Sequence, residues 1–143
     1  MAFLVDFLIG AALGAGFIAL ARAVGRLERI VLAGGLLVAA LAYVGFGVGP
    51  RGASALPVEL AGSLLFAAFG VLGLVSSLWF LALGWALHAI WDLAVPGLTD
   101  VSYMPVWYAA VCIGFDVVLA AYLIGRARDL LPVPGVTDPA RAV

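Results

Sequence analysis

Three ionisable side chains and one thiol are spaced so that they would face one another inside an otherwise apolar sequence. His88 and Asp92 are one helical turn apart, and Gly84 extends the same face by another turn. Cys112 and Asp116 have the same spacing in the next apolar segment. An imidazole beside a carboxylate suits general acid–base catalysis. We therefore predict a catalytic group of His88, Asp92 and Asp116.

A metal site is the alternative interpretation of the same residues. Nitrogen, oxygen and sulfur donors together suit a divalent ion such as zinc. The predicted ligands would be His88, Asp92, Cys112 and Asp116. Cys112 alone is better explained as a small buried hydrophobic residue than as a ligand, since free cysteine is among the most buried residue types.

The composition predicts an all-α membrane protein. Of the 143 residues 66% are hydrophobic and 10% are charged, whereas soluble domains carry about 25% charged residues. A chain this short has too little interior to hide so much apolar surface from water. We therefore expect an integral membrane protein of the cell membrane, with membrane lipid as its surroundings.

Several classes of function are excluded by what the sequence lacks. The net charge of −1 provides no basic patch for nucleic acid. The seven basic side chains are all arginine, which excludes a lysine Schiff base. The single Cys112 excludes an internal disulfide and a CxxC site, and the single His88 excludes bis-histidine haem ligation and the HExxH motif.

We predict five transmembrane helices, each of about 20 residues, in one compact bundle over residues 1–128. The predicted spans cover residues 3–21, 30–48, 58–74, 78–95 and 105–125. The divider at residues 75–78 is weak, so one long tilted helix over residues 58–95 is the alternative. We expect Pro96 and Gly97 to end the fourth span and Pro105 to lie in the first turn of the fifth. Residues 129–143 are predicted to be a short disordered cytoplasmic tail.

The arginines predict the orientation. The cluster between the first two spans and the cluster after the fifth fall on the same face of a five-span bundle. The positive-inside rule makes this face cytoplasmic, with the N-terminus outside and the C-terminus inside. Ala19–Ala21 resembles a signal-peptide cleavage site, but the early charge is Asp6 rather than a cation, so we expect the first span to be retained.

Small residues predict how the first helix packs. Gly10 and Gly14 form a GxxxG face, which lets two helix backbones approach closely in lipid. We expect this face to pack within the chain, and a homodimer contact is the alternative.

The cost of burying charge supports a functional site. An ionisable residue at the bilayer centre costs about 2.5–3.5 kcal/mol on insertion scales, so two aspartates and a histidine on adjacent spans are best explained if they face one another. At about 1.5 Å per residue, His88 should lie between the depths of Cys112 and Asp116, with Asp92 nearer the outer surface. A purely structural hydrogen bond between helices is the alternative. We expect Glu59 only to favour the start of the third span through the helix dipole.

At these residues the chain resembles a family of small bacterial and archaeal integral membrane proteins of unknown function. The resemblance rests on the fairly specific pattern GWxxHxxWD over residues 84–92 and on the segment that ends at Asp116. It implies a multi-pass membrane fold and no particular activity. In that family further histidines often follow the Trp-Asp pair, whereas this chain has Leu93–Pro96 there. A metal site that uses those histidines would be lost or weakened here.

Three functions are compatible with the sequence. The first is a membrane-embedded enzyme that acts on a lipid or another apolar small molecule, with His88 as general acid or base and an aspartate that orients it. The second is a module that binds or transports a metal ion or protons. The third is a structural accessory subunit of a larger membrane complex.

Overall fold

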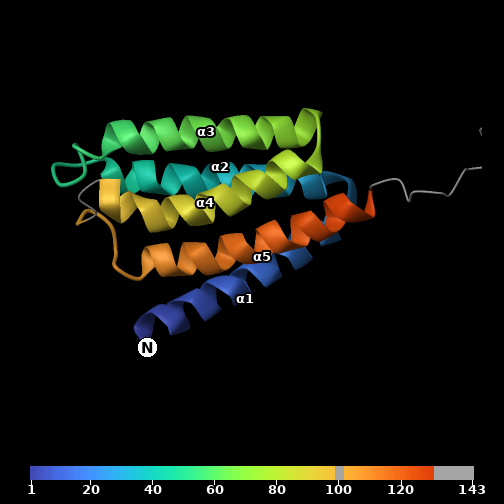
Figure 1. Cartoon of the computed structure of the whole chain (residues 1–143), viewed down its shortest axis with the longest axis horizontal. Coiled ribbons are helices and arrows are strands. Elements are labelled where there is room, and N and C mark those ends of the chain that lie inside the picture. Colours follow the sequence, from blue (N-terminus) through green and yellow to red (C-terminus); the bar gives the residue numbers. More distant parts are fainter. Residues whose placement is uncertain (99–101, 131–143) are drawn as a thin grey trace, which may run out of the picture.

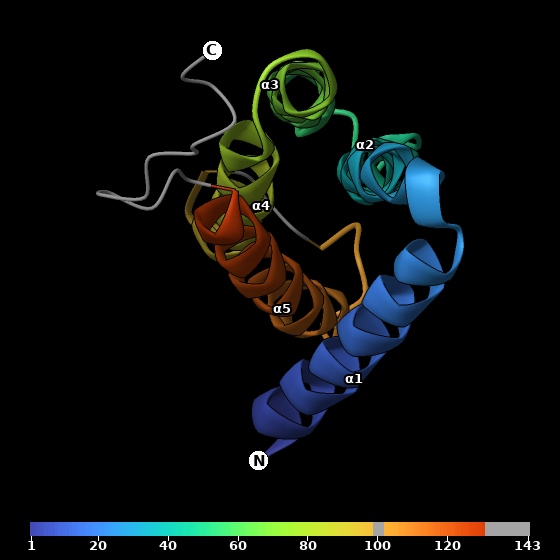
Figure 2. The ribbon, with the colours of Figure 1, turned by 90° about the vertical axis from the view of Figure 1, so that its right-hand side faces the viewer.

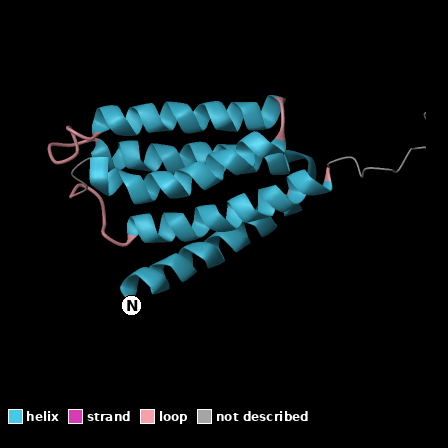
Figure 3. Ribbon diagram, viewed as in Figure 1, coloured by secondary structure: helices cyan, strands magenta, loops and turns pink. Residues whose placement is uncertain are grey.

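The computed structural model describes residues 1–98 and 102–130, and this part of the chain is helical with no strand (Figure 1, Figure 3). The five α-helices are α1 (Ala2–Ala23), α2 (Glu28–Gly47), α3 (Leu56–Val75), α4 (Leu78–Leu98) and α5 (Tyr108–Asp129), with a short 3-10 turn at Gly25–Leu27. The prediction of an all-α protein with five helices is confirmed. The predicted disordered tail lies, from residue 131 onward, outside the described residues.

All five helices are long and apolar enough to cross a membrane. Their outward faces carry large aliphatic side chains that a water-soluble protein would bury. Val38, Leu64 and Leu93, for example, are 68%, 74% and 63% exposed. The polar residues of the site described below are instead buried, which is the distribution expected of a multi-pass membrane protein.

Residues 58–95 lie in two separate helices, and not in the single long tilted helix that was the alternative prediction. Helix α3 ends at Val75, and the N–H of Ser76 closes its last turn on the carbonyl of Leu72. The Ser77 hydroxyl then accepts a hydrogen bond from the N–H of Trp79 at 3.3 Å in the first turn of α4. Such a side-chain contact satisfies an N–H that has no partner within its own helix.

Neither Pro96 nor Pro105 lies at the position in its helix that the sequence predicts. Pro96 lies inside the last turn of α4, which continues to Leu98. A proline this close to the end of a helix removes one hydrogen bond, the one to the carbonyl of Asp92, and the helix tolerates that loss. Pro105 precedes α5 instead of lying in its first turn, because its carbonyl accepts the N–H of Tyr108 in the turn that leads into the helix.

Successive helices run in opposite directions, so the connections alternate between the two ends of the bundle (Figure 1). The N-terminus, the α2–α3 connection and the α4–α5 connection lie at one end. The α1–α2 turn, the α3–α4 turn and the end of α5 lie at the other, which we call the arginine end. It carries the Arg22, Arg26 and Arg29 cluster and the pair Arg126 and Arg128, whereas Arg51 lies at the opposite end.

Helix α1 packs mainly on α5, away from α3 (Figure 2). Glycines make this contact close: a Cβ on Gly10 would lie 1.9 Å from the carbonyl oxygen of Val111, and one on Gly114 would lie 2.0 Å from that of Phe7. Gly14 is similarly placed, 2.9 Å from the carbonyl oxygen of Phe115. The GxxxG face thus packs within the chain, so that a homodimer would need another face. The same close contact between α1 and α5 positions α5, which carries Asp116.

Candidate functional site

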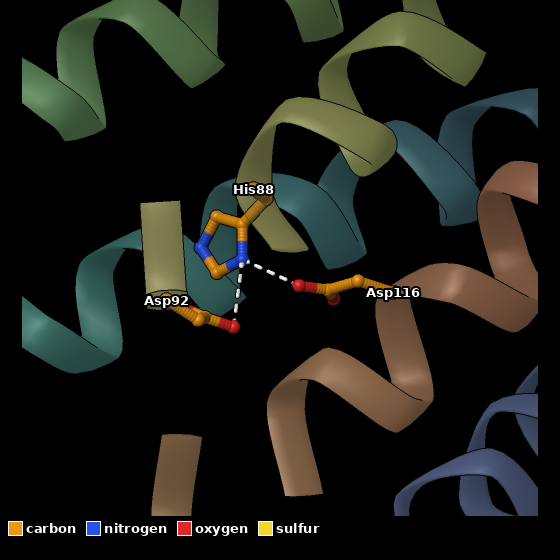
Figure 4. Close-up of side chains that lie close together, drawn as sticks. All are labelled: His88, Asp92 and Asp116. Atoms are coloured by element: carbon orange, nitrogen blue, oxygen red, sulfur yellow. Dashed lines mark hydrogen bonds and ion pairs between the residues drawn. The ribbon is translucent and has the colours of Figure 1, made fainter. Parts of the chain in front are cut away.

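Helices α4 and α5 bring His88, Asp92 and Asp116 together in the interior of the bundle (Figure 4). The Nδ1 atom of His88 lies 2.7 Å from Oδ2 of Asp116 and 3.8 Å from Oδ2 of Asp92. One ligand atom from each residue can be chosen so that all lie within 4.8 Å of one another. The two stripes predicted from the sequence therefore face each other.

The three side chains are shielded from the surroundings. Only 0% of His88, 1% of Asp92 and 1% of Asp116 is exposed. Aromatic rings enclose the imidazole: the ring of Phe66 on α3 packs edge-on at 4.7 Å, and that of Tyr43 on α2 at 6.1 Å. Four helices thus contribute to a site whose low polarity strengthens every electrostatic interaction inside it.

Most polar atoms of the site have no hydrogen-bond partner within the described residues. These atoms are Nε2 of His88, both carboxylate oxygens of Asp92 and Oδ1 of Asp116. The Tyr43 hydroxyl interacts with the Asp92 carboxylate, but the two do not form a hydrogen bond of normal geometry. Buried polar groups are almost always paired, and each unpaired one costs about 1–3 kcal/mol. A group made only to join two helices would satisfy its own atoms, whereas these donors and acceptors are free to bind a ligand.

Cys112 is buried on α5, one turn before Asp116, but it is not part of the convergent group. Its thiol interacts with the Tyr108 hydroxyl and, electrostatically, with Asp92. The structure therefore brings together three of the four predicted ligands and leaves Cys112 at the edge of the site.

Glu59 is a third buried carboxylate, for which the sequence predicts only a role at the start of the helix. It lies in the first turns of α3, is 1% exposed, and accepts hydrogen bonds from Tyr103 at 2.7 Å and from Trp91 Nε1 at 3.4 Å. Gly62 makes room for Trp91, because a Cβ there would lie 2.7 Å from its indole ring.

Glu59 and His88 line the same narrow void, together with Phe66 and Trp91. The void is too small to hold a water molecule. Glu59 contributes to the electrostatic environment of His88, although the two side chains form no hydrogen bond among the described contacts. A buried cluster of three carboxylates and one imidazole is therefore spread over α3, α4 and α5.

This arrangement fits a divalent metal ion. In tetrahedral coordination with bonds of about 2.0 Å, ligand atoms lie about 3.3 Å apart. The observed separations of 2.7 and 3.8 Å from Nδ1 to the two carboxylates bracket that value. Two carboxylates and a neutral imidazole also balance a charge of +2, which is needed where burying an uncompensated charge is costly. Three protein ligands leave one coordination position open.

The sequence matches the profile of a family of unknown function, DUF6010, over residues 5–129. No curated protein and no solved structure matches the chain.

Proposed function

The chain therefore belongs to the DUF6010 family, and we propose that it is a multi-pass membrane protein whose His88–Asp92–Asp116 group binds a divalent metal ion of the zinc class. The observations that carry the proposal are the convergence of ligand atoms from His88, Asp92 and Asp116 and the buried carboxylate oxygens of the two aspartates that have no hydrogen-bond partner in the part of the chain that the structure describes. A divalent ion at this site would be coordinated by carboxylate oxygens that otherwise have no partner among the described residues. It would neutralise the negative charge of the two aspartates. It would also explain why two aspartates are kept in an apolar interior.

We place the protein in the cell membrane, with the arginine end in the cytoplasm and the N-terminus outside. The support is the positive-inside rule applied to the two arginine clusters. His88 lies near the middle of α4, so the metal would be held roughly halfway across the bilayer. Lipid would surround the exposed aliphatic faces.

The experiment is metal analysis of the purified protein. The protein is produced in zinc-supplemented cells, extracted in detergent without chelator, and analysed by inductively coupled plasma mass spectrometry. We expect about one divalent ion per chain in the wild type and its loss in Asp92→Asn and Asp116→Asn. These variants keep side-chain shape and remove one charge each.

Asp6→Asn is the matched control, because Asp6 is a carboxylate of a predicted span that lies outside the group. It should keep its metal. Wild-type protein that contains no stoichiometric ion, or site variants that retain it, would contradict the proposal. Variants that unfold readily with no metal in the wild type would identify the group as a structural contact between helices.

A second candidate function, acid–base catalysis on a lipid or other apolar substrate, is favoured by the way Asp116 holds the imidazole. A carboxylate on Nδ1 fixes the tautomer and leaves Nε2 as the base, as in catalytic dyads and triads. Nε2 is buried beside the void that Glu59 also lines. Substrate would enter only if α3 and α4 separate there, because the void does not admit water.

This candidate is tested by comparing lipid extracts from cells that produce the wild type and His88→Ala at equal levels. A lipid that accumulates or disappears only with the wild type supports catalysis. Identical extracts from the two strains argue against it.

A further inference from the structure

A cavity of about 180 Å³ opens at the arginine end, whereas His88 lies near the middle of α4. Four elements line it: the α1–α2 turn, the start of α2, the start of α4 and the end of α5. Its charged lining consists of Arg26, Arg29, Arg126 and Glu28, and we call it the arginine pocket. A water molecule takes up about 30 Å³ of liquid, so the pocket has room for about six waters or for one tetrahedral anion.

Arg29 is held in place while one of its donors has no partner. Its Nε donates a hydrogen bond to the carbonyl of Gly73 near the end of α3, which fixes the guanidinium at the pocket. Its Nη2 is buried and makes no hydrogen bond within the described residues. An orphaned donor of a charged group is costly. An anionic oxygen in the pocket would satisfy it.

The remaining charges leave the pocket positive. Glu28 is its one carboxylate, and it already accepts a hydrogen bond from Tyr122 and lies 3.7 Å from Arg126. Arg26 is exposed in the 3-10 turn and has no described ion pair. Three arginines against one occupied carboxylate produce a net charge of +2 among the lining residues.

The other walls are apolar. Leu32, Leu78 and Leu123 lie next to the arginines, so a charged group in the pocket would lie beside aliphatic surface at the end of the bundle. Guanidinium groups recognise phosphate through paired N–H donors, and fixed arginines do so with little loss of side-chain freedom.

We propose that the arginine pocket binds a phosphate group. Two kinds of ligand present a phosphate group: the headgroup of an anionic phospholipid and a soluble phosphate. The aliphatic wall and the place of the pocket at one end of the helices fit both a headgroup with its chains along the bundle and a small ion. The experiment therefore tests the anionic phospholipid and the soluble phosphate in separate arms.

The lipid arm uses native mass spectrometry of the detergent-solubilised full chain with phosphatidylglycerol and, for comparison, phosphatidylcholine. The soluble arm measures the shift of the unfolding temperature with inorganic phosphate, with sodium chloride at equal ionic strength as reference. We expect saturable binding in one arm. It would appear either as a one-to-one complex with phosphatidylglycerol or as a saturable shift of the unfolding temperature with inorganic phosphate. Arg26→Gln and Arg29→Gln should each weaken it about fivefold or more, which corresponds to about 1 kcal/mol per arginine at a membrane surface.

Arg128→Gln is the matched control, since this arginine is at the same end, is exposed and does not line the pocket. It should bind as the wild type does. Arg26→Gln keeps the test valid if Arg29→Gln fails to fold, because Arg26 is exposed and makes no described contact across the bundle. Equal weakening by Arg26→Gln and Arg128→Gln would overturn the proposal in favour of general surface charge, and so would binding in neither arm.

Discussion

Replacing Gly114 by alanine should loosen the helix contact that holds Asp116 in place. Gly114 lies on α5 two residues before Asp116, against the backbone of α1. A Cβ at this position would lie 2.0 Å from the carbonyl oxygen of Phe7 and 3.0 Å from the N atom of Ala11. Both contacts are to backbone atoms, which cannot rotate away as a side chain could.

The size of the effect follows from these distances. Ordinary contacts lie at about 3.5 Å, so α1 would have to move about 1.5 Å away from α5 at this point. Overpacking of this kind costs about 1–3 kcal/mol, and a rigid backbone contact places the cost near the upper value. Alanine recovers about 1 kcal/mol of helix propensity over glycine. We therefore expect a net loss of about 2 kcal/mol.

The measurement is unfolding of the detergent-solubilised protein by titration with sodium dodecyl sulfate, followed by circular dichroism. Gly125→Ala is the control on the same helix, because a Cβ there would meet nothing within 4 Å. It gains the same propensity without a clash and should be neutral or stabilising. If Gly114→Ala and Gly125→Ala are equally stable, the close α1–α5 contact is refuted.

Three further substitutions test the interior by the same titration. Gly62→Ala should lose up to about 2 kcal/mol net, because the new Cβ would lie 2.7 Å from the ring of Trp91 and this clash of about 1–3 kcal/mol outweighs the helix propensity that alanine gains; a variant more stable than the wild type would contradict this packing. Ser63→Ala should cost about 0.6 kcal/mol, the average for such bonds in membranes, since it removes a hydrogen bond to a carbonyl of α2; a loss above 2 kcal/mol would show a larger role. Tyr122→Phe should cost about 1 kcal/mol through its lost hydrogen bond to Glu28, and no change would argue against that bond.

The sequence predicts that His88 lies on a face of α4 that meets the α5 face carrying Cys112 and Asp116, but it leaves the exact pairing open. Spacing placed each residue on a definite face, and a short connection made α4 and α5 antiparallel neighbours. What spacing could not decide was which residue of α5 lies opposite the imidazole. One helical turn is about 5.4 Å, which is also the uncertainty of a depth counted from an approximate loop boundary. Cys112 and Asp116 differ by just that turn.

The environment of Glu59 was missed because its partners come from other elements. Trp91 is on α4 and Tyr103 lies between α4 and α5, so no spacing within α3 connects them. A signal was present nonetheless: Glu59, Gly62, Ser63 and Phe66 are spaced i, i+3, i+4 and i+7, and all are buried. A stripe of small and polar residues on an apolar helix indicates the face that turns inward in lipid.

The arginine pocket could not be predicted because its parts meet only at the end of the folded bundle. The positive-inside rule accounts for the position of the arginine clusters at one end of the bundle, and this rule requires no cavity between them. The hydrogen bond from Arg29 to the end of α3 depends on how α2 and α3 pack, which spacing along one helix does not determine.

X-ray absorption spectroscopy at the zinc edge, on zinc-loaded protein in detergent, tests the metal site most directly. The ligand group of His88, Asp92 and Asp116 predicts a first shell of nitrogen and oxygen only, at about 2.0–2.2 Å, with the outer-shell features of one imidazole. These features should disappear in His88→Gln. A sulfur scatterer at about 2.3 Å would assign Cys112 as a ligand, and a first shell unchanged by His88→Gln would contradict the proposed site.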